Sequence, residues 1–137
     1  RQKQRLETTG QLARLIEKTI GRREKNKHPA TRCFQAIRIF VNDEMAHLAK
    51  GLVEAIEVLR PGGRLVVISF HSLEDRLVKR TIKEDARPGQ VRRNIPQHPD
   101  WKPVLKAIGK AIKASESELS VNPRARSAVM RIAEKLA

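Results

Sequence analysis

The feature that most constrains the fold is an apolar run at residues 65–70, which follows the break Pro61-Gly62-Gly63. The run is apolar on both alternations, which is typical of a strand covered on both faces, as in a parallel sheet. Proline stops the preceding segment and the glycines permit a sharp reversal. Helical patterns at 43–59 and from Ser72 to about Lys83 flank this strand. A helix, a strand and a helix in succession predict an α/β fold.

Two helical patterns precede this unit. In the first, Thr8 or Thr9 can serve as the N-cap and Gly21 can end the helix in the left-handed conformation. The second begins at His28-Pro29, with Pro29 suited to a first helical turn, and continues to Leu59. Its pattern fits one bent helix or two. The expected apolar positions are Leu12, Leu15, Ile16 and Ile20 in the first helix, then Ala30, Cys33, Phe34, Ile37, Phe40 and Val41, and then Met45, Leu48, Ala49, Leu52, Ile56 and Leu59.

The C-terminal third is less regular. Residues 86–103 contain four prolines and no periodicity, which predicts a long loop that binds something or stays mobile. Residues 104–112 fit either a strand or a short helix. A helical turn is expected at 115–119, where Ser115 and Glu118 have capping-box spacing, and a final strand at 127–136.

The charge of the chain narrows the classes of protein. Its 137 residues carry 29 Lys and Arg against 15 Asp and Glu, a formal net charge of +14. No apolar run reaches the roughly 18–20 residues that a membrane helix needs, and the lone Cys33 excludes an internal disulfide. We therefore expect a cytoplasmic protein that binds a polyanion. The first residue is Arg1 rather than Met, which is expected of a piece of a longer protein.

Three segments could carry a function. The stripe Arg32, Gln35, Arg38 and Asn42 offers guanidinium groups for phosphates and amides for base edges; it fits a solvated helix face equally well. Residues 69–76 leave the carboxyl end of the expected strand and begin a helix, where ligands often bind. In a structural role, Ser72 caps that helix while Glu74 and Asp75 favour its dipole. Residues 122–127 form a turn that presents two arginines, for phosphate contact or simply to solvent.

Several chemistries are disfavoured. A Ser/His/Asp hydrolase would need a nucleophile elbow, and such residues within seven positions rarely meet as a triad. The four histidines, His28, His47, His71 and His98, lack the spacing and cysteine partners of a metal site. The chain has no G-x-G-x-x-G or P-loop motif. One Trp, three Phe and no Tyr argue against a base-stacking platform.

Longer strings carry a family resemblance. LRPGGRL at 59–65, followed by the apolar strand, resembles the helix-to-strand-five junction of Rossmann-like S-adenosylmethionine-dependent methyltransferases. HPATR at 28–32, FQAIRI at 34–39, VNDE at 41–44, ISFHSLEDR at 68–76 and NPRARSA at 122–128 together resemble the bacterial 16S ribosomal RNA cytosine-N4 methyltransferase family known as RsmH or MraW. The match runs from Thr8 to Leu136 and is weakest at 86–103.

The resemblance implies methyl transfer from S-adenosylmethionine to the exocyclic N4 amine of a cytidine in 16S ribosomal RNA. It implies that residues 1–40 end a helical insertion domain that helps to bind RNA. Residues 41–137 would be the C-terminal half of a Rossmann-like methyltransferase domain, holding the last three strands of a seven-stranded sheet with the final pair antiparallel.

The resemblance also implies where the working residues lie. The cofactor loop and the catalytic segment would lie upstream, so no cofactor or catalytic residue is assigned here, and no metal is expected. By strand-end placement, the candidates for the pocket edge are Ser69, His71, Ser72, Glu74 and Arg76. The candidates for contact with small-subunit RNA or the 30S subunit, or for support between domains, are His28, Arg32, Gln35, Arg38, Asn42, Arg124 and Arg126. The alternative is a non-catalytic RNA-binding or ribosome-assembly module.

Overall fold

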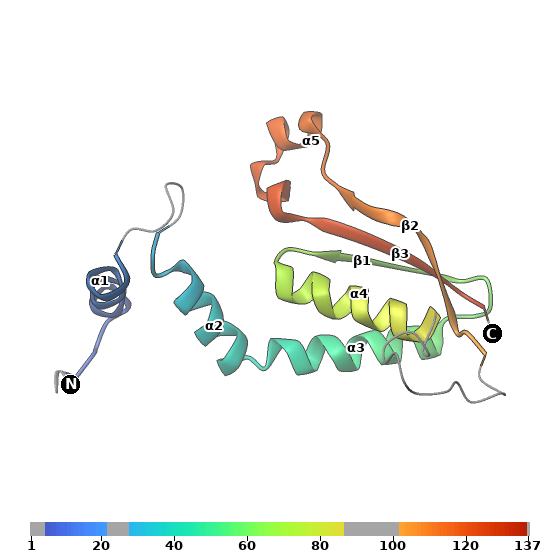
Figure 1. Cartoon of the computed structure of the whole chain (residues 1–137), viewed down its shortest axis with the longest axis horizontal. Coiled ribbons are helices and arrows are strands. Elements are labelled where there is room, and N and C mark those ends of the chain that lie inside the picture. The colour runs from blue at the N-terminus through green and yellow to red at the C-terminus, as the bar shows by residue number, and fades with distance from the viewer. Residues whose placement is uncertain (1–4, 22–27, 87–101, 137) are drawn as a thin grey trace, which may run out of the picture. The chain divides into compact units, whose positions relative to one another are not determined.

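The computed structural model describes residues 5–21, 28–86 and 102–136 (Figure 1). The chain divides into two units, residues 1–44 and 45–137, which are described separately. In chain order the elements are α1 (Thr9–Ile20), α2 (Thr31–Val41), α3 (Glu44–Val58), β1 (Arg64–Ser69), α4 (Ser72–Ala86), β2 (Leu105–Lys113), α5 (Glu116–Val121), the 3-10 helix η2 (Pro123–Ser127) and β3 (Val129–Lys135).

Helix α1 begins with a capping box. The Thr8 hydroxyl accepts from the Gln11 backbone N–H at 3.2 Å, and the Gln11 side-chain oxygen accepts from the Thr8 N–H at 3.3 Å. Two backbone donors that the helix leaves open are thereby satisfied. At the other end Gly21 has φ 69°. The predicted helix and its end are confirmed, and Thr8 rather than Thr9 is the N-cap.

The long helical pattern after His28 forms two helices. Pro29 lies in the turn before α2, and Ala30 is the N-cap residue. Asp43 separates α2 from α3 with φ 48°, a conformation that Asp tolerates better than most residues. Across this break the Arg38 guanidinium donates to both carboxylate oxygens of Glu44, at 2.7 and 3.0 Å. This contact holds the end of α2 to the first residue of α3.

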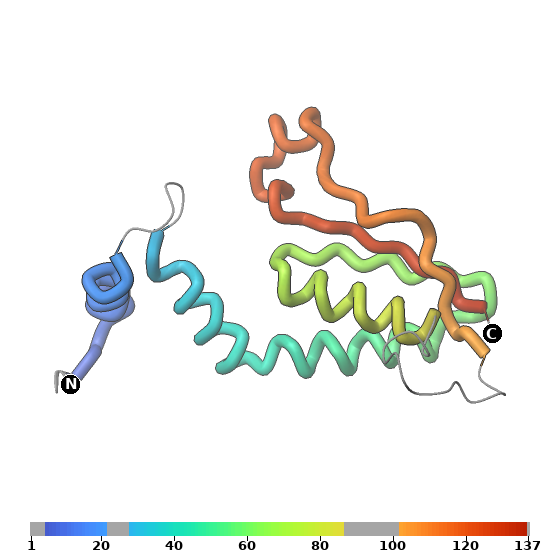
Figure 2. Tube along the Cα trace, in the orientation of Figure 1, coloured from blue at the N-terminus to red at the C-terminus, as the bar shows by residue number. Residues whose placement is uncertain are grey.

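The described residues of the second unit form one apolar core. Leu52 and Ile56 from α3 and Val78 and Ile82 from α4 meet Leu65, Leu105 and Ala133 from the three strands. Val78, Leu105 and Ala133 are 0–1% exposed. Figures 1 and 2 show α4 lying against the sheet. The predicted apolar face of α3 is confirmed at Leu52 and Ile56.

The sheet is antiparallel throughout, in the order β1-β3-β2. The expectation that 65–70 is a strand is confirmed, but among the described residues it has no parallel neighbour. Apolarity on both faces reports how much side-chain surface needs burial and does not fix the direction of the neighbouring strand. The described residues form a mixed α/β fold with helices and a small antiparallel sheet.

The two faces of this sheet differ in how far their side chains are buried. On one face Leu65 and Ser69 are buried; on the other Val66 and Ile68 are 52% and 54% exposed. Between β1 and β3, the register places Val66 opposite Ile132 and Ile68 opposite Met130. Between β2 and β3, it places Ile108 opposite Ile132 and Ile112 opposite Met130. The second face is therefore an apolar surface of six side chains. The expectation that β1 is covered on both faces is wrong for the part of the chain that the structure describes.

The Pro-Gly-Gly turn is held by the last strand. Gly62 N–H donates to the Lys135 carbonyl at 2.8 Å, and Lys135 N–H donates to the Gly63 carbonyl at 2.9 Å. A Cβ at Gly63 would lie 2.8 Å from the Arg60 carbonyl oxygen, so a side chain does not fit there. The Lys135 ammonium also donates to the Ile56 carbonyl at 2.9 Å, which fixes the end of α3 against β3.

The C-terminal elements resolve the remaining patterns. Residues 104–112 contribute to strand β2, not to a helix, and the final strand is β3. The Ser115 hydroxyl accepts from the Glu118 N–H at 3.2 Å, which confirms the predicted cap. Most of the predicted 86–103 loop, residues 87–101, lies outside the described residues.

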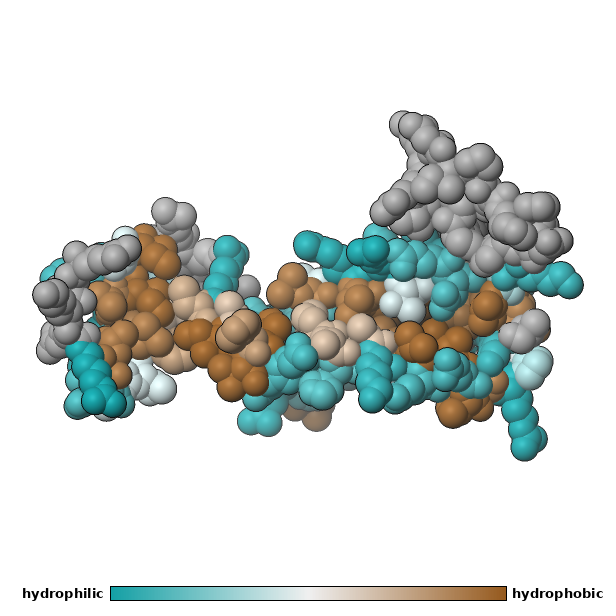
Figure 3. Space-filling model, turned by 90° about the horizontal axis from the view of Figure 1, so that it is seen from below, coloured by the Kyte–Doolittle hydropathy of each residue, from teal (hydrophilic) through white to brown (hydrophobic). Residues whose placement is uncertain are grey.

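Exposed apolar side chains also occur along α3, where Val53 and Val58 are 52% and 81% exposed (Figure 3).

Within the described residues, the helices are too short or too polar to cross a lipid bilayer.

Candidate functional site

The turn from β1 into α4 is held by a reciprocal hydrogen-bond pair. The Glu74 carboxylate accepts from the backbone N–H of Phe70 at 2.8 Å and of His71 at 3.0 Å. In return, His71 Nδ1 accepts from the Glu74 N–H at 3.3 Å. This is the pattern of a capping box, with an imidazole nitrogen in place of the usual hydroxyl.

The expectation that Ser72 caps this helix is therefore wrong. Ser72 is the first residue of α4 and is exposed, and His71 occupies the capping position. Ser72 is a preferred capping residue type, but Glu74 lies three residues after His71. The reciprocal bond therefore forms at His71.

The His71 side chain is 12% exposed and is held at Nδ1 by the Glu74 N–H. With Nδ1 accepting, the neutral ring carries its proton on Nε2. That nitrogen lies 3.3 Å from the second Glu74 oxygen, is buried, and has no hydrogen-bond partner among the described residues. The turn thus holds a buried imidazole nitrogen at the end of β1 whose hydrogen-bonding capacity the described residues leave unused.

An ion pair joins α4 to the central strand. Arg131 on β3 donates to both carboxylate oxygens of Asp75, at 2.7 and 3.0 Å, and the side chains are 20% and 23% exposed. These hydrogen bonds, with the charges of Arg131 and Lys79, lower the pKa of Asp75 although burial opposes the shift. Sequence reasoning placed Asp75 only on the helix dipole and missed this partner. The sequence did contain a signal for it. Arg131 falls at a position of β3 whose side chain points inward, and a buried charge needs an opposite charge beside it.

The other pocket-edge candidates are placed around this turn. Ser69 is buried at the end of β1, whereas Ser72 and Arg76 are exposed on the first turns of α4. The structure thus brings together His71 and Glu74 by direct contact.

The RNA candidates fall into both units. In the first, His28 Nδ1 accepts from the Ala30 N–H at 3.2 Å, and its Nε2 lies 3.9 Å from Glu17 on α1. Arg38 makes the Glu44 contacts described above, and the Asn42 amide donates to Glu44 at 3.4 Å.

These three side chains therefore make internal contacts, so the stripe is in part structural. Arg32 is exposed on α2 and Gln35 is half-buried there; in the second unit Arg124 and Arg126 are exposed on η2. Over residues 5–21, 28–86 and 102–136 no three metal-ligating side chains gather.

Replacing His71 tests the cap. His71→Ala removes the acceptor for the Glu74 N–H, and we expect a loss of about 0.5–2 kcal/mol in the free energy of unfolding. His71→Asn supplies an acceptor that suits the same position, so it should retain most of the stability. Urea unfolding of the two variants measures this, and equal losses would contradict the capping role.

Replacing Asp75 tests the ion pair through pH. Because the folded pKa of Asp75 is lowered, the pair stabilises the protein above the ordinary pKa and loses this effect as pH falls through the lowered value. Asp75→Asn should cost about 1–3 kcal/mol at pH 7, and this cost should shrink below about pH 4.

Asp85→Asn is the matched control for the pH experiment. Burial, and then the charge of Glu84, raise the pKa of Asp85, so its ionised form opposes folding. Removing this carboxyl should leave stability at pH 7 unchanged or higher, the opposite sign from Asp75→Asn. A cost of Asp75→Asn that does not vary between pH 7 and pH 2 would show that the pair contributes no charge interaction.

Comparison with known proteins shows which proteins the chain is similar to. It is 54% identical to Ribosomal RNA small subunit methyltransferase H of Methylococcus capsulatus over 137 residues, which are 100% of this chain and 45% of that protein. The proteins of the same name from Dechloromonas aromatica and Thioalkalivibrio sulfidiphilus are 51% and 52% identical, over 99% and 100% of this chain and 45% and 44% of their own length.

The chain thus spans less than half the length of these curated relatives. The model of the MraW methylase family matches residues 1–136, nearly the whole sequence. The resemblance in the strings at 28–44, 68–76 and 122–128 is therefore confirmed: the chain belongs to the MraW methylase family.

Proposed function

We propose that this chain is the C-terminal part of an S-adenosylmethionine-dependent enzyme that methylates the N4 amine of a cytidine in small-subunit ribosomal RNA. The observation that carries the proposal is the family match over residues 1–136, with relatives above 50% identity named for methylation of that RNA. The formal charge of +14 suits a partner of this kind.

The sheet supports a Rossmann-like completion of the fold. The six apolar side chains on its outer face need cover, and β1 has a partner strand on one edge only, among the residues described. An apolar strand with an open edge and an open face fits a larger sheet with helices on both sides. On this reading β1, β2 and β3 are its last three strands, and residues 1–40 end a helical insertion domain.

S-adenosylmethionine, when bound, supplies a methyl group activated by its sulfonium. The 137 residues include no glycine-rich phosphate or nucleoside loop, so we assign the cofactor to the remainder of the protein. The residues described here then contribute to the target side of the site.

The strand-end turn suits a pocket edge. The lone pair of a cytosine amine is delocalised into the ring, so the amine reacts only when it is held in line with the methyl group. His71, fixed by Glu74 at the end of β1, can help to hold that base or take part in removing its proton. We place Ser69, Ser72 and Arg76 with His71 and Glu74 at this edge.

RNA contact is proposed for both units. In the first, Arg32, Gln35 and Arg38 lie on α2, His28 precedes this helix and Asn42 is its C-cap residue. In the second, Arg124 and Arg126 are exposed on η2. Such contacts offset the cost of a few kcal/mol for extracting the target base from its stack. The 30S subunit or its RNA would be the partner, and the cytoplasm the compartment.

Methyl transfer tests the function directly. We expect the full-length protein to transfer labelled methyl from S-adenosylmethionine to small-subunit RNA, and the 137-residue chain alone to transfer none. Nucleoside analysis of the product should place the label on N4 of cytidine. RNA binding without transfer by the full-length protein would instead favour a non-catalytic assembly module.

The pocket edge is tested by separating folding from activity. If His71 only caps α4, His71→Asn should keep both stability and methyl transfer. If it also meets the target base, His71→Asn in the full-length protein should keep stability but lower kcat about 10–100-fold. Single-turnover rates and urea unfolding on the same sample distinguish these outcomes, and unchanged rates would remove His71 from the pocket edge.

A further inference from the structure

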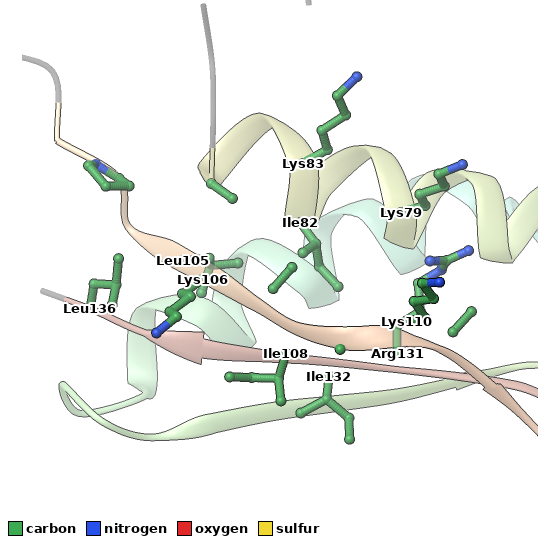
Figure 4. A pocket seen from close by; sticks show the side chains of 15 residues that line it. Lys79, Ile82, Lys83, Leu105, Lys106, Ile108, Lys110, Arg131, Ile132 and Leu136 are labelled. Atoms are coloured by element: carbon green, nitrogen blue, oxygen red, sulfur yellow. The ribbon is translucent and has the colours of Figure 1, made fainter. Parts of the chain in front are cut away.

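A groove runs between α4 and strand β2 in the second unit (Figure 4). Its volume is about 570 Å³, within the roughly 300–1,000 Å³ of ligand pockets. Ile82 points from α4 toward β2, and Leu105 lies close by on that strand. Among the described strands, β2 and β1 lie at opposite edges of the sheet, so this groove is separate from the turn that follows β1.

Among the described residues, the charged side chains that line the groove are all cationic. Lys79 and Lys83 come from α4, Lys106 and Lys110 from β2, and Arg131 from β3. Arg131 is matched by Asp75, whose carboxylate also feels the charge of Lys79. Among the described residues, the four lysines form no salt bridge. Figure 4 shows Lys79, Lys110 and Arg131 gathered toward one end and Lys83 standing out from α4.

Protection of a sheet edge explains only half of this charge. Lysines and bulges on an edge strand discourage pairing with other chains, and β2 has both, with an irregularity between Ile108 and Ile112 and a positive φ of 66° at Gly109. Lys79 and Lys83, however, lie on a helix at i and i+4, where like charges destabilise each other. An anion held between α4 and β2 would relieve that repulsion.

We propose that this groove binds a stretch of RNA backbone, with its phosphates on the lysines that line the groove. The proposal rests on the proposed function, which supplies an RNA partner. Lysine acts as a point charge that attracts phosphate without a fixed geometry, so the groove holds and positions the RNA and reads no sequence.

The test measures binding of the full-length protein to small-subunit ribosomal RNA over a series of salt concentrations. The variant Lys79→Gln/Lys83→Gln/Lys110→Gln removes three cations from the groove. We expect the slope of log K against log salt to fall in magnitude by about 2, with a loss of affinity of about tenfold or more at 0.15 M salt.

The matched control is Arg60→Gln/Arg64→Gln/Lys113→Gln. It removes the same charge from exposed positions that do not line the groove, so we expect a change in affinity below threefold. Equal losses in the two triple variants would overturn the groove, because binding would then follow net charge alone.

A second pair of variants guards against misfolding. Ala111 lines the groove and is exposed on β2, so Ala111→Glu introduces a negative charge there and Ala111→Gln a neutral side chain of equal size. We expect Ala111→Glu to bind RNA several-fold more weakly than Ala111→Gln, with the same urea midpoint. Equal binding by these two variants would contradict the proposal.

Two further measurements separate this inference from its premise. If poly-glutamate displaces RNA from the wild type and loses its own binding in the groove variant, the groove takes an acidic polypeptide and the proposal is wrong. If a groove variant binds RNA normally and transfers the methyl group, the proposed function stands, but the groove is not an RNA-binding site. If the wild type transfers no methyl group and RNA binding is lost only in the groove variant, the groove stands and the proposed function is wrong.

Discussion

The second unit depends on the bidentate ion pair between Asp75 and Arg131. It joins the first turn of α4 to the central strand of the sheet, 56 residues away in sequence, at 2.7 and 3.0 Å. A half-buried carboxylate and guanidinium that satisfy each other in a fork fix both distance and orientation. The pair therefore sets where α4 lies on β3, and with it the position of the His71 turn at one end and of the lysines that face β2.

The outer face of the sheet sets a requirement that the described residues do not meet. Val66 and Ile68 are about half exposed, beside apolar partners on β3 and β2. A contiguous apolar surface of this kind marks an interaction site. Relatives more than twice as long as this chain provide the material for such cover. The same surface explains why the pattern at 65–70 reads as a strand buried on both sides.

The sequence predicted most elements because periodicity and capping are local properties. The apolar spacing of α1, the cap at Thr8 and the final strand all follow from neighbours within a few residues. The misses have non-local or competitive causes. Arg131 finds Asp75 only once the chain has folded, and the antiparallel place of β3 beside β1 depends on topology. Ser72 lost the capping position because Glu74 lies at the reciprocal distance from His71.

Three arginines and four lysines of this basic chain have different surroundings. The arginines at 38, 80 and 131 each donate to a carboxylate within 3 Å and so stabilise helices and their junctions. Lys79 and Lys83 of α4 and Lys106 and Lys110 of β2 line a groove where the described residues include no acidic side chain. Planar guanidinium forks suit fixed internal pairs, whereas mobile ammonium groups suit a backbone whose phosphates shift with its sequence. Affinity for RNA would then come from these lysines together with the exposed arginines of α2 and η2, and the choice of base from a separate pocket that must hold its amine in line with the methyl donor.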